Sequence, residues 1–402
     1  MSEFLEDEIV HLAKAFDRVT VAPLRPTSQR SAHVPAGIQV DTSLADQLTH
    51  LRSLSHLHLH SRATVALGRA IQPNPVLRAV GAEVPQAKDV RNTRWLKTYL
   101  LGRADSRSVF TWARNRRPPS LAYTFWLDAT TAGFRAAWPD VPVVSRIHGG
   151  DLYSEQQGWA TIPFQQASLS ACSLVASVSR SGTEYLRAKF PDLQDRVVTR
   201  TLGIQDLGGV SPPAPGSVRR LLSVSSIDSN KRVDLIAQVA VSLASDGVPV
   251  HWTHVGSGPD LPKVQAHLEH RTPLLTSRLR GQIPLEDVRH EMMTGGYHAF
   301  LNLSISEGAP VSLMEAQCAG IPVVATAVGG IPAVCPPDLN ELVSVYDSVS
   351  SISEALRRAI ARGDRDRVKR RDHWDHHYNE ASTYRLWSAE LLELARAQGP
   401  SR

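Results

Sequence analysis

The sequence predicts an α/β protein with two Rossmann-like domains that face each other across a cleft. Three observations carry this prediction. The chain has 402 residues, of which 42% are hydrophobic and 21% are charged, and this is enough ordinary globular sequence for two cores. Apolar, strand-like runs alternate with helix-length segments in both halves, which indicates parallel sheets covered by helices. A stretch rich in proline and glycine separates the two halves.

The first half alternates less regularly than the second. Residues 3–23 read as a helix followed by a strand, and further apolar, β-branched runs follow between turn signals. The strands expected in this half are residues 18–23, 121–126, 141–147, 173–179 and 196–201.

The second half alternates cleanly from residue 220 onward, and its strand-like runs are continuously apolar, which is typical of parallel strands buried on both faces. The strands expected here are residues 220–226, 248–256, 277–283, 298–304, 322–328 and 341–346. The helices expected between and after them are residues 231–244, a stretch ending at 268, 284–293, 311–320 and 351–361.

The domain boundaries follow from this alternation. We expect a first domain over residues 1–207, a hinge over 208–217 and a second domain over 218–371. Residues 372–402 have aromatic and leucine side chains at helical spacing, and we expect this helix to pack back toward the first domain. Ligands of open parallel sheets bind beyond the carboxyl ends of the strands, so the cleft is the expected active site.

The net charge of +5 raises the possibility of nucleic-acid binding, but no stacking platform or recognition-helix motif accompanies it, and we expect no nucleic-acid partner.

Residues 91–117 are strongly basic, with Trp95, Tyr99 and Leu100 interleaved as on an amphipathic helix. Such a helix either rests its apolar stripe on the core and exposes its charges, or makes peripheral contact with an anionic membrane surface.

The amino terminus is acidic and lacks the layout of a secretory signal, and no apolar run approaches the roughly 18 residues of a membrane helix, so we expect a cytoplasmic protein.

Cys172, Cys318 and Cys335 are widely spaced, which favours buried free thiols. The run His56 to His60 has no neighbouring carboxylate or cysteine, and we expect no metal site there or elsewhere.

The densest motif lies between an expected strand and an expected helix. Glu307 is followed by Gly308, Ala309, Pro310 and Val311 at the start of the helix, where backbone N–H groups and the helix dipole favour a diphosphate. One turn inside the helix, Glu315 can accept hydrogen bonds from a ribose diol, and Glu307 can accept them from sugar hydroxyls. The motif therefore predicts a pocket for a nucleotide at one end and a sugar at the other.

These residues resemble a known family. Two glutamates with seven residues between them, embedded in EGAPVSLMEAQCAGIPVVATAVGGIP, look like the donor-site signature of family 4 glycosyltransferases, which have the two-domain GT-B fold. The resemblance runs from about residue 120 to the carboxyl end. It implies that the donor binds mainly the second domain and the acceptor the first.

Three further pieces belong to the same resemblance. The loop 225–234 is similar to the family's phosphate-binding loop, and the resemblance makes Lys231 the cation for the donor diphosphate. The family usually has an arginine where this chain has Ser225 or Ser226. Whether Arg232 takes the place of that arginine stays open. His148, in a histidine-glycine motif, implies a contact with the donor sugar. The loops at Gly256 and Gly281 resemble those that shape the base pocket.

The expected site is therefore spread over several loops. The residues expected to contact the donor are Ser226, Lys231, Gly256, Gly281, Gly308, Ala309, Pro310, Val311 and Glu315, and those expected to act in catalysis are His148, Lys231 and Glu307.

The resemblance implies a retaining, metal-independent transfer of a sugar from a nucleotide-diphosphate sugar, which is a co-substrate rather than a cofactor, to a hydroxyl of a glycan, a glycolipid or a small molecule. Polysaccharide, glycolipid or secondary-metabolite glycoside synthesis would use such a reaction. Because residues 3–23 read as a helix and then the family's second strand, we expect the first domain to lack its first strand. Two alternatives stay open: a non-catalytic remnant that binds a glycan or a partner, and a GT-B phosphorylase or epimerase.

Overall fold

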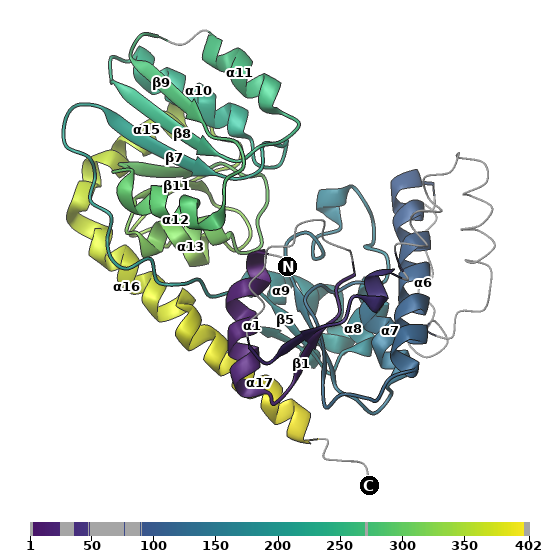
Figure 1. Ribbon diagram of the computed structural model, residues 1–402. Helices are drawn as coiled ribbons and strands as arrows, with labels where there is room; N and C mark the ends of the chain where they lie inside the picture. The colour runs from purple at the N-terminus through teal and green to yellow at the C-terminus, as the bar shows by residue number, and fades with distance from the viewer. Residues whose placement is uncertain are drawn as a thin grey trace. The chain divides into compact units, whose positions relative to one another are not determined.

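The protein is described by a computed structural model that covers residues 3–24, 36–46, 48, 76, 89, 91–269 and 272–397. The chain forms two compact units, Met1–Arg200 together with Tyr384–Arg402, and Thr201–Thr383. Residues 208–217, the expected hinge, lie inside the second unit, where the Ser211 N–H donates to the Ala319 carbonyl at 2.9 Å and the Ala214 N–H to the Gly296 carbonyl at 2.9 Å. Among the described residues, the first unit has two parallel sheets and the second unit has one (Figure 1).

The first unit contains all five strands expected in the first half of the chain. Its strands are β1 (Val19–Val21), β2 (Ile38–Val40), β3 (Ala122–Thr124), β4 (Val143–Ile147), β5 (Leu174–Ser177) and β6 (Val197–Thr199). Its helices are α1 (Glu3–Ala15), α6 (Thr93–Arg114), α7 (Ala129–Ala137), α8 (Gln165–Ala171) and α9 (Arg180–Lys189), with short 3₁₀ turns at Glu155–Gln157 and Pro191–Arg196.

Strands β3 to β6 form one parallel sheet in sequence order, and β1 pairs with β2 in a second parallel sheet. β4 is buried at every position because it lies between β3 and β5 and is covered on both faces. The face of the sheet toward α1 also receives α17 (Glu380–Ala397), whose Trp387 and Leu391 pack with Val144. The carboxyl-terminal part of α17 therefore belongs to the first unit, beginning at Tyr384.

The second unit has one six-stranded parallel sheet. Its strands are β7 (Arg219–Val224), β8 (Val250–Val255), β9 (Leu275–Leu279), β10 (Ala299–Asn302), β11 (Val323–Thr326) and β12 (Glu341–Val343). Its helices are α10 (Val233–Ser245), α11 (Leu261–Glu269), α12 (Leu285–Thr294), α13 (Val311–Cys318), α14 (Ile331–Val334), α15 (Val349–Arg362) and α16 (Arg367–Tyr378), with a 3₁₀ turn at Gly363–Asp366.

The spatial order of this sheet is β12-β11-β10-β7-β8-β9. Helix α10 packs against α11 and α15, and these helices share the main apolar core with the sheet, whereas α13 packs against α12 and α16. The chain leaves β7 toward β8 and β9 but later leaves β10 toward β11 and β12. The order of strands therefore reverses between β7 and β10, which makes their carboxyl ends the expected binding position.

The strand expected at residues 277–283 begins and ends earlier than the sequence indicates, because β9 covers Leu275–Leu279. Gly281 has a positive φ of 66° and Pro284 starts the next helix, so the backbone leaves the sheet before these residues. The run from His56 to His60 lies outside the described residues.

The basic segment 91–117 is helical over α6, and Trp95, Val109 and Trp112 of this helix are buried. Its apolar side therefore packs in the first unit, while Arg94, Lys97 and Arg114 are exposed. Within the part of the chain that the structure describes, no helix has both the length and the apolarity needed to cross a bilayer. The three cysteines are buried and free, as expected.

Candidate active site

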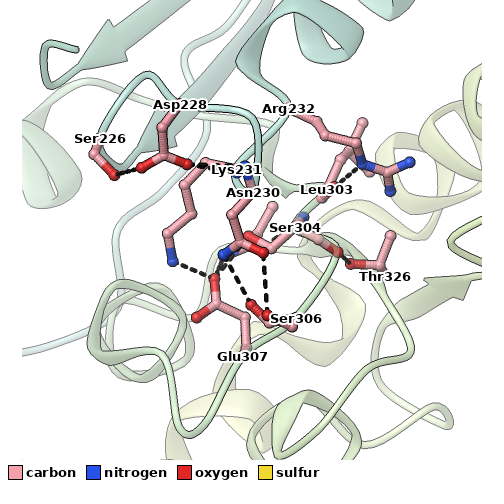
Figure 2. A network of polar contacts seen from close by, with 11 residues as sticks. Ser226, Asp228, Asn230, Lys231, Arg232, Leu303, Ser304, Ser306, Glu307 and Thr326 are labelled. Atoms are coloured by element: carbon pink, nitrogen blue, oxygen red, sulfur yellow. Dashed lines mark hydrogen bonds and ion pairs between the residues drawn. The ribbon is translucent and has the colours of Figure 1, made fainter. Parts of the chain in front are cut away.

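Two loops meet where the strand order of the second unit reverses. The loop after β7 carries Lys231, and the loop after β10 carries Glu307. The Lys231 Nζ lies 2.6 Å from the Glu307 Oε1, so the two expected site residues form an ion pair across 76 positions of sequence (Figure 2). The Glu307 side chain is 9% exposed and that of Lys231 is 24% exposed, which leaves the pair accessible from one side.

The Glu307 carboxylate is held through one of its two oxygens. Besides Lys231, the Ser304 hydroxyl donates to Oε1 at 2.7 Å and the Asn302 amide approaches it at 3.4 Å. Among the described residues, no donor is found for Oε2. One carboxylate oxygen is therefore occupied by the protein and the other is available to a ligand hydroxyl.

The backbone of Glu307 is fixed by the glycine doublet of the motif. Gly329 has a φ of 53°, and a Cβ at this position would lie 1.8 Å from the Glu307 carbonyl oxygen. The Gly330 N–H also approaches this oxygen, at 3.4 Å. Only glycine permits the two loops to come this close, so the doublet positions Glu307 rather than contacting a ligand itself.

The loop that carries Lys231 is organised by Asp228. Its Oδ1 accepts from the backbone N–H groups of Asn230 and Lys231 at 3.0 Å each, and its Oδ2 accepts from the Ser226 hydroxyl at 2.7 Å (Figure 2). Asn230 joins this loop to the other one through a hydrogen bond from its amide to the Ser306 carbonyl at 3.1 Å. Ser226, expected at the donor, is exposed and bonded to Asp228.

Arg232 does not stand beside Lys231 as a second cation. Its guanidinium donates to the carbonyl oxygens of Leu303, at 2.6 Å, and Val345, at 2.9 Å. Its backbone has a φ of 48°, which is rare for a residue with a Cβ. These contacts connect the loop after β7 to the ends of β10 and β12, so they give Arg232 a structural role.

The start of α13 lies directly after Glu307. Gly308 and Pro310 are buried, and Ala309 and Val311 are partly exposed. No acceptor is found in the described part of the chain for the backbone N–H groups of Ala309 and Val311, as is usual at a helix start without a side-chain cap. These N–H groups, next to the Lys231 ammonium, form a site suited to an anion.

Glu315 lies one turn inside α13 and is 2% exposed. Its Oε1 accepts from the Arg289 Nε at 3.3 Å, and the Arg289 Nη1 donates to the Gln205 side chain at 2.9 Å. Arg289, on α12, was not among the residues expected from the sequence. Its position makes the neighbourhood of Glu315 a charged, hydrogen-bonded site rather than an apolar one.

Gly256 and Gly281 lie side by side beyond β8 and β9, where the Gly256 N–H donates to the Gly281 carbonyl at 2.9 Å. A Cβ on Gly256 would lie 1.8 Å from the Ser225 carbonyl oxygen, so the glycine lets the loop after β8 pack on the loop after β7. Behind it, His254 is fully buried with its Nδ1 2.8 Å from the Ser223 hydroxyl, and burial lowers the pKa of His254 to about 4.

His148 belongs to the first unit, just beyond the end of β4. Its backbone N–H donates to the Asp151 Oδ1 at 2.6 Å, and the Asp151 Oδ2 accepts from the Leu127 N–H at 2.9 Å. Burial, and then the nearby Arg146 guanidinium, lower the pKa of His148 from 6.5 to about 3, so the imidazole is neutral at physiological pH.

The structure thus brings together Lys231, Glu307 and the start of α13, and it places Glu315 further along the same helix. Asn302, Ser304 and Arg289 were not expected from the sequence. Asn302 and Ser304 are polar residues in an otherwise apolar strand segment, and this could have marked them, whereas nothing in the local sequence of α12 indicates that Arg289 reaches α13. No cluster of three or more histidine, cysteine or acidic side chains that could hold a metal occurs among the described residues.

Comparisons with known proteins show what the chain is similar to. Residues 211–375 match the sequence profile described as "Glycosyl transferases group 1". The chain is 28% identical over 140 residues to the phosphatidylinositol N-acetylglucosaminyltransferase GPI3 subunit of Saccharomyces cerevisiae, covering 35% of this chain and 30% of the relative. It is 25% identical over 218 residues to the putative colanic acid biosynthesis glycosyltransferase WcaL of Escherichia coli, covering 51% of this chain and 52% of the relative.

Among solved structures, the pneumococcal O-GlcNAc transferase GtfA in complex with UDP and GlcNAc superposes with a TM-score of 0.57 at 15% identity, covering 72% of this chain and 60% of that one. This likeness concerns the fold, and it confirms the α/β class expected from the sequence. The chain spans about half or less of the two curated relatives. Residues 211–375 are therefore similar to glycosyl transferases group 1, and the fold is that of the GT-B transferases.

Proposed function

We propose that this chain is a retaining, metal-independent glycosyltransferase that moves a sugar from a nucleotide-diphosphate sugar to a hydroxyl acceptor. The observation that carries the proposal is the meeting of Lys231 and Glu307 at the strand reversal of the second unit, beside the start of α13. A cation, a helix start and a carboxylate with one available oxygen correspond to the diphosphate and the sugar of such a donor.

Recognition of the diphosphate falls to Lys231 and the backbone N–H groups of Ala309 and Val311. When the bond between the anomeric carbon and the phosphate oxygen breaks, its electron pair stays on the diphosphate, whose negative charge grows. A fixed ammonium and fixed N–H dipoles stabilise this charge more than they stabilise the intact donor, so they act on the rate as well as on binding.

Recognition of the sugar and the ribose falls to the two glutamates. The Oε2 of Glu307 accepts a hydroxyl of the donor sugar, while its Oε1 stays with Lys231 and Ser304. Glu315 accepts from the ribose diol, and the Arg289 guanidinium holds its carboxylate in place. His148 contacts the donor sugar near the reacting carbon in this proposal, as the family resemblance implies.

Transfer with retention requires no protein base. The acceptor oxygen forms its bond to the anomeric carbon on the face that the diphosphate leaves, and the acceptor proton passes to a phosphate oxygen. We propose a glycan, glycolipid or small-molecule hydroxyl as the acceptor. The cytoplasmic location and a contact of residues 91–117 with a membrane surface stay predictions.

The comparisons support the choice of enzyme class. The curated relatives are named as sugar transferases, and the solved GtfA structure contains UDP and GlcNAc. No observation favours the alternative of a non-catalytic remnant or of a phosphorylase or epimerase.

Thermal unfolding in the presence of UDP-, GDP- and ADP-sugars tests the proposal. A ligand at a hundred times its dissociation constant stabilises the folded state by about 2.7 kcal/mol, which is a shift of several degrees in the midpoint. We expect at least one nucleotide sugar to shift the wild-type protein and to shift Lys231→Ala less, and we expect transfer of labelled sugar to a pooled set of hydroxyl acceptors. Folded protein that none of these nucleotides stabilises would contradict the proposal.

A further inference from the structure

Three histidines lie near the end of α16, in the second unit. His373, His376 and His377 occupy positions i, i+3 and i+4 of this helix, and residues at these spacings share one face of a helix. The ring centroids of His373 and His377 are 4.7 Å apart, and the two ring planes are tilted by 49°. The backbone of α16 therefore brings these two imidazoles next to each other.

The separation of the two rings is that of imidazoles bound to one metal ion. Bonds between an imidazole nitrogen and a metal measure about 2.0–2.1 Å, which places the centroids of two ligand rings about 4.5 Å apart at a right angle and about 5.2 Å apart at a tetrahedral angle. The 4.7 Å between His373 and His377 lies within this range. The helix therefore holds the two side chains at the distance that a shared ion requires.

A hydrogen bond already orients the ring of His373. Its Nε2 lies 3.0 Å from the carbonyl oxygen of Ala333, on α14. A carbonyl oxygen only accepts hydrogen bonds, so this nitrogen carries the hydrogen and the lone pair of the neutral ring lies on Nδ1. Metal-binding histidines are held in the same way, by a bond from the second ring nitrogen to a carboxylate or a backbone carbonyl. His373 therefore offers Nδ1 as a ligand atom.

Both rings are neutral at physiological pH, as metal ligands must be. Burial lowers the pKa of His373, although the bond to Ala333 and the Asp338 carboxylate raise it, and the nearby His376 lowers it further. Burial is also the largest cause that lowers the pKa of His377, followed by the His373 and His376 rings. Protons therefore compete less with a metal ion for these rings than for an ordinary histidine.

His376 is not a ligand of the same ion. Its ring lies 4.6 Å from that of His377, but adjacent residues of a helix point in different directions. Among the residues that the structure describes, no three histidine, cysteine or acidic side chains are placed to hold a metal together. A site on α16 therefore has two protein ligands, which leaves the other positions of the ion to water.

We propose that His373 and His377 chelate a divalent transition-metal ion on α16. This departs from the expectation, drawn from the sequence, that the chain has no metal site. Imidazole nitrogens suit zinc, copper and nickel, whereas magnesium and calcium prefer oxygen ligands, and copper binds most tightly of the divalent series. The ion joins consecutive turns close to Asn379, where α16 ends, and so stabilises that end of the helix. It takes no part in sugar transfer, so the site does not rest on the proposed function.

Residue-resolved chemical modification of the full-length, untagged protein tests the site. Diethyl pyrocarbonate acylates unprotonated histidine rings, and mass spectrometry of the digested protein reports each histidine separately. We expect zinc to slow the modification of His377, which is exposed, and magnesium at equal concentration to leave it unchanged. His290, which is exposed on α12, should react equally with and without zinc.

The variant His373→Gln separates chelation from binding at a single ring. Its amide can still donate to the Ala333 carbonyl, so the contact between α16 and α14 is kept, but the imidazole ligand is lost. We expect the zinc concentration that half-protects His377 to rise about tenfold or more in His373→Gln. His376→Ala, on the same helix face, is the matched control and should keep the protection of the wild-type protein. Circular dichroism verifies that both variants are folded.

The reciprocal variant gives a second measurement. Zinc should raise the thermal unfolding midpoint of the wild-type protein, because it binds the folded state, and it should raise that of His377→Ala less. Absence of protection of His377 at millimolar zinc overturns the site. Equal protection of His377 in the wild-type protein and in His373→Gln also overturns it, because a chelate needs both rings.

Discussion

Lys231 and Glu307 form an ion pair of 2.6 Å at the point where the strand order of the second unit reverses. The Lys231 ammonium is therefore already paired before a phosphate binds. Its partner is the Glu307 carboxylate, which Ser304 and Asn302 also contact. A diphosphate that binds beside it shares this cation with Glu307, which couples the position of the leaving group to that of the sugar.

Lys231→Ala is expected to lower kcat about 100-fold or more, because a fixed charge that acts on the growing negative charge of the leaving group contributes on this scale. The dissociation constant of the nucleotide sugar should rise by a smaller factor. Steady-state kinetics and isothermal calorimetry measure the two effects. Lys263→Ala, which removes an exposed lysine paired with Asp260, is the control and should leave both unchanged. Equal turnover of Lys231→Ala and the parent would remove this lysine from the mechanism.

Ser304→Ala is expected to reduce kcat/KM for the nucleotide sugar about tenfold, because the mutant lacks a hydrogen bond of 2.7 Å that orients the Glu307 carboxylate. Binding of the nucleotide without the sugar should change less, since the Ser304 hydroxyl donates to Glu307, the glutamate proposed to bind the sugar. Ser304→Thr keeps the hydroxyl and should restore activity. Ser306→Ala, whose hydroxyl donates to Asn230, is the neighbouring control. A loss of nucleotide binding in Ser304→Ala would point to a structural role instead.

Glu315→Ala is expected to weaken nucleotide binding by about 2 kcal/mol, roughly 30-fold, because charge-assisted hydrogen bonds to the ribose are lost. If Arg289 acts by orienting Glu315, the double variant with Arg289→Ala should bind no more weakly than Glu315→Ala alone. Calorimetric titration with UDP or GDP gives these values. Glu286→Gln, an exposed residue of α12, serves as the control. An unchanged dissociation constant in Glu315→Ala would take this residue out of the site.

The pH dependence of stability should reveal the buried Asp151. Burial raises its pKa from 3.8 to about 8, although the hydrogen bonds from Leu127 and His148 lower it, so the folded state keeps a proton that the unfolded state releases. Its contribution to stability is therefore lost as pH rises toward 8. His148 has the opposite sign, because its pKa is lowered from 6.5 to about 3 and its contribution is lost as pH falls below 6.5.

Above pH 6.5 only Asp151 of this pair still titrates, so the window from pH 6.5 to 8 isolates it. We expect the thermal unfolding midpoint of the wild-type protein to fall across this window, and that of Asp151→Asn to fall less, even though the variant is less stable at every pH. Circular dichroism at matched ionic strength measures both. Identical slopes for the two proteins would show that Asp151 is ionised throughout.

A chelator should leave sugar transfer intact, since the proposed charge stabilisation comes from Lys231 and backbone N–H groups rather than from a divalent ion. The measurement compares initial rates with and without EDTA, followed by readdition of magnesium or manganese. Activity that EDTA abolishes and manganese restores would overturn the metal-independent mechanism.

The strands and helices of both units could be predicted from sequence because their signals are local. Continuous apolar runs such as residues 298–304 and 322–328 became β10 and β11, and the glycine-containing segment after residue 307 became the start of α13. The end of β9 was misplaced because the expected strand was extended to Ile283, while the positive φ of Gly281 turns the backbone away after Leu279. Periodicity carries no information about such a backbone turn.

The site was predictable where a motif is contiguous and not where it is assembled from distant elements. The contiguous motif marked Glu307 and Glu315 as expected site residues, and the resemblance of the loop 225–234 to the family's loop marked Lys231. Whether Arg232 stands in for a missing arginine depended on where its side chain reaches, and the structure directs it to Leu303 and Val345. Arg289 comes from a separate helix and meets Glu315 only because α12 and α13 pack together.

By itself, the order of residues determined the α/β class, the positions of most strands, and a helix start that follows Gly308, with one glutamate before the helix and another inside it. Hydrophobic period, turn residues and helix-start chemistry act within a few residues, so sequence alone reveals them. Tertiary structure alone decided which oxygen of Glu307 the protein occupies, which arginine faces Glu315, and that Trp126 is exposed beside the His148 ring, which has no hydrogen bond to any described residue. Those outcomes depend on strand order and loop packing, and these join residues that the chain keeps far apart.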